Sequence, residues 1–166
     1  AEVTPPVLAI HRGDATLLRR LIDEDPSIAS RRYADLPYGN IDLGGATLLH
    51  CAVEFGEVDC IAVLVRCGAD VNAEATVRND IGGQTPIFHA LSSTPQNNTP
   101  AMDFLVTQAR GGLDLTVRAT FRRFGEIQSQ PITVTELADL IAAQAKASSS
   151  KDMELLRRMD ASDRGL

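Results

Sequence analysis

Residues 45–73 read GATLLHCAVEFGEVDCIAVLVRCGADVNA, a stretch with two short apolar runs separated by a glycine. Thr47 can accept the open N–H groups of a helix that begins directly after it, and Gly56 marks the end of that helix. Residues 58–65 then predict a second helix, which ends at Gly68 because glycine readily adopts a left-handed backbone. Helices this short cannot bury their apolar faces alone, so the hairpin must stack on another one.

The same pattern occurs on both sides of this stretch. Residues 9–13 (AIHRG) align with residues 52–56 (AVEFG) without a gap, and residues 83–90 (GQTPIFHA) repeat the start of the stretch. A degenerate version of the same repeat start, TEL, follows at residues 135–137. Such self-similarity predicts an array of stacked repeats rather than a single closed domain.

These residues resemble the ankyrin repeat family, whose unit carries T-P-L-H-x-A and a terminal G-A-D. The matching stretches are TLLHCA at residues 47–52 and GADVN at residues 68–72. The motif proline is replaced by Leu48 and Glu136 in two units, and the motif histidine by Phe88 in another. The resemblance implies an all-α, ankyrin-like solenoid of about four helix-turn-helix repeats, with extended β-hairpin-like finger loops. One array is expected over residues 1–166, with repeats at residues 5–32, 43–76, 81–117 and 133–162.

The joints between the predicted helix pairs are too long and too apolar to be simple linkers, and we expect them to form extended fingers. They comprise residues 27–44, 73–83 and 116–134. The first helix pair is expected over residues 7–24, with Pro5 and Pro6 ahead of it and Asp25-Pro26 as its stop. Turn-forming insertions at residues 92–100 and 147–150 should separate the two helices of the last two repeats, the final helix carrying an apolar stripe at Met153, Leu155, Leu156 and Met159.

Composition narrows the class of protein further. The chain has 166 residues, 44% of them hydrophobic, as in an ordinary folded protein. Lys and Arg number 16 against 22 Asp and Glu, and the net charge of −6 disfavours nucleic acid and anionic membranes. The sequence contains no apolar run of about 18 residues, so we expect no membrane span. The number of cysteines, three, is odd and favours a reducing compartment, so we expect the cytoplasm. The first residue is Ala1 rather than Met, so the alternative that an export signal was removed stays open. We expect a monomer.

A zinc site is the most specific alternative to a purely structural role for these side chains. Histidine and cysteine are common zinc ligands, and the candidates are His50, Cys51, Cys60 and Cys67. Structural zinc sites usually pair ligands two to four residues apart, and this spacing does not fit. Cys60 falls on the apolar face of the second helix, which favours a core position. We therefore expect no metal and no cofactor, and the family resemblance implies that His50 joins neighbouring repeats through backbone hydrogen bonds.

An enzymatic function has little support in the sequence. The three histidines, His11, His50 and His89, fall in separate units, and no serine or cysteine lies in a known nucleophile motif. The carboxylates of residues 23–25 are typical of a solvated helix end. A metal-assisted hydrolase that uses His50 with cysteine or carboxylate ligands is kept as the enzyme alternative.

The sequence predicts a non-catalytic module that binds another protein through its concave face and its finger loops, because stacking leaves those positions free. The predicted partner-binding residues include His11, Arg12, Glu54 and Phe55, which directly precede the mid-unit glycine of two repeats, and Ala46 and Gln84, which lie between the Gly and the Thr of the motif. Those on the fingers are Tyr33, Tyr38, Arg78, Asn79, Asp80, Phe121, Arg122 and Phe124. Two other functions stay open: a structural or oligomerisation spacer of a larger protein, and single-stranded nucleic-acid binding by the Arg and Phe residues of 118–124, which the acidic net charge disfavours.

Overall fold

The computed structural model describes residues 4–33, 44–92, 99–109, 112–123, 126–128, 130–144, 146, 154 and 158. The chain divides into two compact units, Ala1–Val134 and Thr135–Leu166, which are described separately. In the described part of the chain, no helix has both the length and the apolar character needed to cross a membrane.

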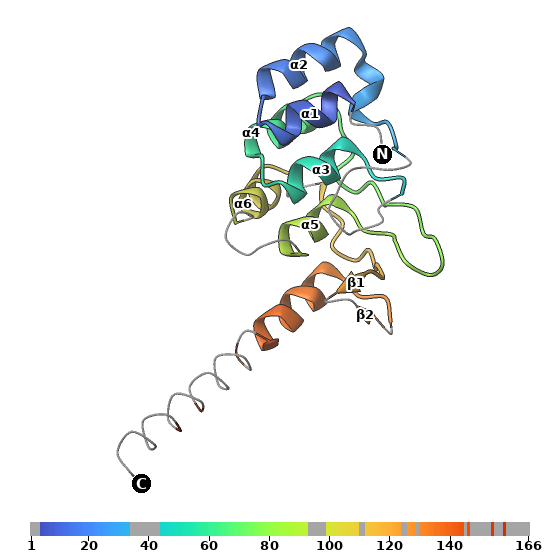
Figure 1. The fold of residues 1–166 in the computed structure, drawn as a ribbon, viewed down its shortest axis with the longest axis vertical. Helices are drawn as coiled ribbons and strands as arrows, with labels where there is room; N and C mark the ends of the chain where they lie inside the picture. The colour runs from blue at the N-terminus through green and yellow to red at the C-terminus, as the bar shows by residue number, and fades with distance from the viewer. Residues whose placement is uncertain are drawn as a thin grey trace. The chain divides into compact units, whose positions relative to one another are not determined.

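The described residues of the first unit include three pairs of α-helices (Figure 1). They are α1 (Pro5–His11) with α2 (Ala15–Glu24), α3 (Leu48–Glu54) with α4 (Val58–Arg66), and α5 (Pro86–Ser92) with α6 (Thr99–Gln108). The helices α1, α3 and α5 pack in one row, and α2, α4 and α6 pack in a second row. This arrangement is the helical solenoid that the sequence predicts.

The ends of the helices follow from local sequence. Thr47 is the N-cap of α3, and Pro86 is the first residue of α5, as predicted. Gly56 and Gly68 follow α3 and α4 with φ of 67° and 89°, in the left-handed region that glycine tolerates. One expectation is wrong: Pro5 does not precede the first helix but begins it, because the first turn of a helix does not need the missing N–H.

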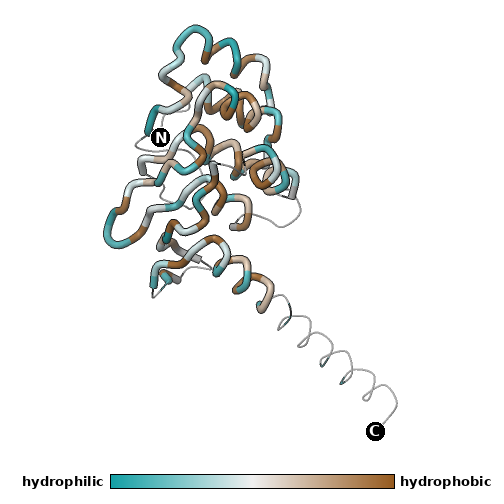
Figure 2. The backbone as a smooth tube through the Cα atoms, turned by 180° about the vertical axis from the view of Figure 1, so that it is seen from behind, coloured by the Kyte–Doolittle hydropathy of each residue, from teal (hydrophilic) through white to brown (hydrophobic). Residues whose placement is uncertain are grey.

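The core lies between the two rows of helices. Many of the hydrophobic residues of these helices, coloured brown in Figure 2, are buried there. Every side chain from residue 48 to residue 53 of α3 is buried, because α3 packs against α1, α4 and α5. In α1, which packs against α2 and α3, only Val7, Ala9 and Ile10 are buried. The helix α3 therefore buries more of its length than α1 does.

The second finger is a hairpin, as predicted for residues 73–83. The Ala75 N–H donates to Gln84 O at 2.9 Å, and the Gly83 N–H donates to Ala75 O at 3.0 Å. At the tip, Arg78 and Ile81 exchange both backbone hydrogen bonds. Asn79 and Asp80 between them have φ of 51° and 63°, the conformation of a type I′ hairpin turn.

The other fingers pair with the second one. The Thr76 N–H donates to Gly44 O at 3.0 Å, and Gly82 forms a bridge with Thr120 of the third finger. The third finger also contains two two-residue strands, β1 (Arg122–Arg123) and β2 (Glu126–Ile127), in antiparallel pairing.

The first finger differs from its prediction at its start, where residues 26–29 form a 3-10 helix, η1 (Pro26–Ala29), instead of extended chain. The Asp25 carboxylate accepts the Ser27 N–H and so caps this turn. Residues 34–43 lie outside the described residues, as do residues 93–98 of the insertion predicted at 92–100. The two ends of that predicted insertion are helical instead, because Ser92 ends α5 and Thr99 begins α6.

In the second unit, residues 135–144 are helical, which agrees with a helix start near Thr135. Leu137 is buried and Leu140 is exposed. Glu154 and Arg158 are helical and form an ion pair. The insertion at residues 147–150 and the apolar stripe at Met153, Leu155, Leu156 and Met159 lie outside the described residues, so the fourth repeat stays a prediction.

Candidate functional site

Two adjacent repeats place equivalent residues next to each other at the ends of α1 and α3. His11 is the last residue of α1 and Arg12 its C-cap, and Glu54 and Phe55 take the same positions at α3. The rings of His11 and Phe55 meet edge to face, with centroids 4.8 Å apart and planes at 87°. His11 and Arg12 are exposed, and Phe55 is partly exposed. We call these four residues the inner row.

Glu54 of the inner row also reaches the third repeat. Its Oε2 lies 2.7 Å from Nδ1 of His89 in α5, and the two side chains are 15% and 3% exposed. The carboxylate thus joins two repeats and keeps a small exposed area. The sequence prediction placed Glu54 at the surface but did not include His89. One feature of the sequence could have indicated His89: it directly follows Phe88, which occupies the position of the motif histidine.

His50 holds the second repeat on the third through backbone hydrogen bonds, which confirms its predicted role. The Thr47 N–H donates to Nδ1 at 3.1 Å, so the ring proton lies on Nε2, which donates to Gln84 O at 2.8 Å. Burial, followed by the nearby charge of His89, lowers the pKa of His50 to about 3. His50 is therefore neutral at physiological pH.

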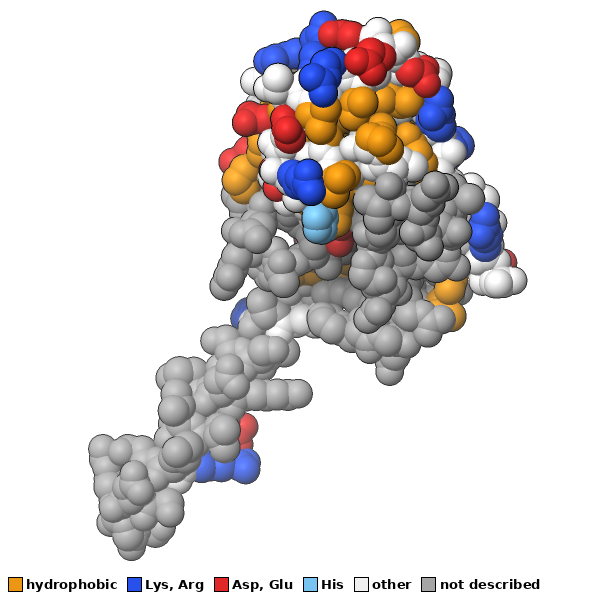
Figure 3. Space-filling model, turned by 45° about the horizontal axis from the view of Figure 1, so that its top comes forward, with side chains coloured by type: hydrophobic (Ala, Val, Ile, Leu, Met, Phe, Trp, Pro, Cys, Tyr) orange, Lys and Arg blue, Asp and Glu red, His pale blue; other side chains and the backbone are white. Residues whose placement is uncertain are grey.

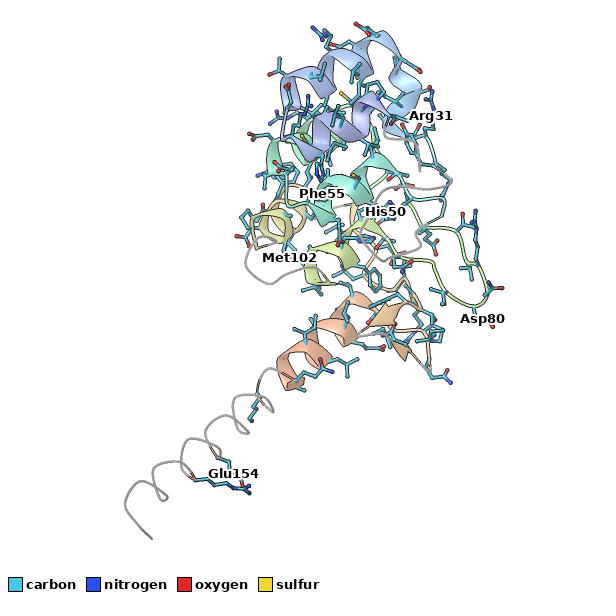
Figure 4. All side chains as sticks on the ribbon, in the orientation of Figure 1. Arg31, His50, Phe55, Asp80, Met102 and Glu154 are labelled. Carbon is cyan, nitrogen blue, oxygen red and sulfur yellow. The ribbon has the colours of Figure 1, made fainter. Side chains whose placement is uncertain are left out.

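The tip of the second finger projects from the body of the unit, with Asp80 at its outer end (Figure 4). Arg78, Asn79 and Asp80 are exposed, which leaves all three accessible to a partner. Val77, which the sequence prediction did not include, is 61% exposed. The guanidinium of Arg78 lies against Gly44 of the first finger. A Cβ added to Gly44 would be only 2.8 Å from the Cζ of Arg78.

Three predicted contact residues, Ala46, Gln84 and Phe121, are instead buried. Ala46 pairs with Tyr33 in a β-bridge, and the Gln84 carbonyl accepts hydrogen bonds from His50 and the Ala75 N–H. Phe121 packs edge to face on Phe88, with centroids 6.0 Å apart. These side chains belong to the packing between repeats and are not offered on the surface of the chain.

The other predicted finger residues are less accessible or lie outside the description. Tyr33 is partly buried, and burial raises the pKa of its hydroxyl. Arg122 is described by its backbone, which pairs with Ile127 across the β1–β2 hairpin. Tyr38 and Phe124 lie outside the described residues.

Arg32 is a second structurally important residue that the sequence prediction did not include. Its guanidinium donates to Gly45 O at 3.1 Å and to Glu74 O, and so ties the first finger to the second. Both acceptors are backbone carbonyls, which leave no residue pattern in a sequence. Only the folded chain reveals this contact.

The zinc alternative finds no support in the described residues, where no three His, Cys, Asp or Glu side chains are grouped to hold a metal ion. Cys51 and Cys60 are buried. Burial raises the pKa of Cys60 to about 11, so its sulfur is a protonated thiol at neutral pH, as expected of a core cysteine.

Comparison with known proteins agrees with this geometry. The family model described as ankyrin repeats (3 copies) matches residues 1–75. The chain is also similar to the serine/threonine-protein kinase VIK of Arabidopsis thaliana, with 35% identity over 86 residues. That alignment covers 52% of this chain and 16% of the kinase. Ankyrin repeats are generally protein–protein interaction modules and are typically non-catalytic. The motif match and the stacked helix pairs together show that the chain carries ankyrin repeats and that residues 1–75 belong to the ankyrin repeat family.

Proposed function

We propose that the chain is a non-catalytic recognition module that binds a partner protein through the inner row and the tip of the second finger, residues 77–80. The observation that carries the proposal is the edge-to-face contact of His11 and Phe55. It lies at a position that repeat stacking leaves accessible, and the exposed Arg12 follows His11 directly. Aromatic and arginine side chains together are typical of the residues that dominate protein interfaces.

The scaffold supports this function energetically. The inner row is placed by α1 and α3, whose buried faces pack on each other, so little conformational entropy is lost when a partner binds. The acidic net charge of −6 supports a protein partner over nucleic acid or an anionic membrane. The odd number of cysteines, three, supports a reducing compartment such as the cytoplasm.

An enzymatic activity is not part of the proposal. The similarity to a protein kinase involves only 16% of that protein, so it provides no basis for assigning kinase activity here. His50 and His89, the two histidines that lie together, are buried. His50 bonds to backbone groups and His89 to Glu54, which supports structural roles.

The test is partner capture by the immobilised chain, followed by affinity measurement with the captured protein after purification. We expect Phe55→Ala to weaken binding at least about tenfold, as for an interface hot spot. Combining it with Arg12→Ala, a second change in the inner row, should abolish capture, with a melting temperature close to that of the wild type. Arg20→Ala, at an exposed position of α2, is the matched control and should bind normally. A large loss of stability in the Phe55 variant, with unchanged affinity, would make Phe55 a packing residue.

A second candidate function is an oligomerisation or spacer role within a larger protein. The observation that favours it is a group of apolar side chains over the part of the unit that α1 and α2 form, bordered by acidic and basic side chains (Figure 3). Leu8, Leu17 and Leu21 of these helices are partly exposed. Light scattering separates the two functions, because the recognition module is expected to be a monomer at all concentrations and the spacer to form a stable oligomer.

A further inference from the structure

Two buried histidines lie next to each other where the third repeat packs on the second. The rings of His50 and His89 meet edge to face, with centroids 5.5 Å apart. His50 bonds to backbone groups of Thr47 and Gln84, whereas His89 bonds to the carboxylate of Glu54. The first set of partners requires a neutral imidazole, and the second also accepts a protonated one.

We propose that the Glu54–His89 pair is a pH-sensitive link between α3 and α5, which tightens the stacking of the third repeat on the second when the solution becomes mildly acidic. The link joins residues 35 positions apart in sequence, across the repeat boundary. It requires no partner protein, so it goes beyond the proposed function and can be tested separately from it.

The direction follows from the chemistry of the pair. In alkaline solution a neutral His89 donates its Nδ1–H to the carboxylate in an ordinary hydrogen bond. Once the imidazole is protonated, the same contact becomes a charge-assisted hydrogen bond, which is roughly twice as strong. Because the side chains are only 15% and 3% exposed, salt and water screen their attraction weakly.

Among the described residues, the carboxylate of Glu54 lies within hydrogen-bond distance of His89, and the other charged or titratable groups on the neighbouring elements are as follows. Other groups on α3 and on its neighbour α1 are His50, held neutral by its backbone partners, and His11, which contacts Phe55. The charge of Arg32, from the first finger, lowers the pKa of His50.

The remaining neighbours of α3 and α5 are α4 and α6. The charged residues of α4 are Asp59 and Arg66, both exposed, and Glu57, its N-cap, is partly exposed. The charged residue of α6 is Asp103, which is exposed. These groups face solvent, where water and salt screen them.

A double-mutant cycle tests the link on the whole chain without a partner. Urea unfolding of the wild type, Glu54→Gln, His89→Gln and the double variant gives the coupling between the two residues at pH 8.5 and at pH 6.0. Glu54→Gln keeps an oxygen that accepts the Nδ1–H, so it removes the charge and retains the hydrogen bond. We expect the coupling factor in the unfolding equilibrium constant to be at least about fivefold larger at pH 6.0. An equal factor at both pH values overturns the proposal.

The matched control is the exposed ion pair of Arg19 and Asp23 on α2, whose side chains are 55% and 62% exposed. Its coupling should be small and the same at both pH values, because an arginine does not titrate in this range and the pair is solvated. A pH-dependent coupling of this pair as well would point to a general effect of pH and count against a specific link.

A second measurement keeps the proposal testable if a variant fails to fold. In the wild type, amide hydrogen exchange should show α5 becoming better protected relative to α1 between pH 8.5 and pH 6.0, after correction for intrinsic exchange. In folded Glu54→Gln, the same change of pH should leave the relative protection of α5 unchanged, because the charge of the carboxylate is gone. Unchanged relative protection of α5 in the wild type, or an equal gain in Glu54→Gln, would show that the pair is merely structural.

Discussion

The imidazole Nε2 of His50 lies 2.8 Å from the carbonyl oxygen of Gln84, 34 residues further along the chain. The same ring accepts the N–H of Thr47 at the start of its own helix. One buried side chain therefore caps α3 and fixes the finger that leads into α5, so local helix formation and repeat stacking depend on the same residue.

Replacing His50 by leucine should destabilise the array strongly. His50→Leu introduces an apolar side chain of similar size, leaves the Thr47 N–H without its partner and removes one of the two hydrogen bonds to the Gln84 carbonyl, which keeps the bond from the Ala75 N–H. The unpaired N–H costs about 1–3 kcal/mol and the lost hydrogen bond about 1 kcal/mol, so we expect a loss of about 2–4 kcal/mol in the free energy of unfolding, measured by urea denaturation. His11→Ala, at the exposed end of α1, should change it by no more than about 0.5 kcal/mol.

Stability should also fall on acidification because of His50. Its pKa is lowered to about 3 in the folded chain, whereas histidine in an unfolded chain titrates at about 6.5. The unfolded state binds the proton first, so this contribution to stability is complete above about pH 6.5 and is lost progressively as the pH falls to about 3. Urea midpoints measured between pH 7.5 and pH 4 should decrease less in His50→Gln than in the wild type. Equal decreases in both proteins would contradict this assignment.

Two glycines with positive φ should respond differently to alanine. A Cβ on Gly45 would lie 2.0 Å from Thr76 Oγ1, so Gly45→Ala separates the first finger from the second as well as straining the backbone. Gly68 has nothing within 4 Å of its Cβ position, so Gly68→Ala adds only the strain of φ 89°. We expect losses of about 1 kcal/mol for Gly68→Ala and at least about twice that for Gly45→Ala, from thermal unfolding. Similar losses would mean that the fingers adapt easily.

A glycine at the tip of the second finger should stabilise the folded chain and weaken partner binding. Asp80 has φ of 63°, and Asp80→Gly creates the Asn-Gly turn that type I′ hairpins favour. We expect the free energy of unfolding to rise by about 0.5 kcal/mol, because glycine tolerates this conformation without strain. If the tip contacts the partner, the same change weakens partner binding. A variant that is more stable and binds as well as the wild type would remove Asp80 from the interface.

Phe121 should behave as a core residue. It is buried and packs edge to face on Phe88. Phe121→Ala is therefore expected to lower the free energy of unfolding by about 3 kcal/mol, because it leaves a cavity in the packing. A denaturant titration checks this value, and an effect on partner affinity without loss of stability would restore the sequence-based assignment.

The repeat pattern predicted the elements that depend on neighbouring residues. Thr47, Pro86 and Gly56 act through backbone groups a few residues away, so the ends of α3 and α5 could be read directly. The role of His50 followed from the family pattern. The 3-10 turn after α2 was not predicted, because it depends on one side-chain cap, Asp25, in a segment otherwise typical of extended chain.

The sequence by itself determined that short helix pairs stack into an array, because periodicity and capping are local properties of the chain, and the role of His50 came from the family resemblance. Only the tertiary structure decided which loop residues are accessible: it buries Ala46, Gln84 and Phe121 and leaves Val77 in solvent. It also brought Glu54 to His89 and Arg32 to two carbonyl groups. These contacts depend on how one repeat sits on the next, and residues so far apart in the chain leave no periodic signal.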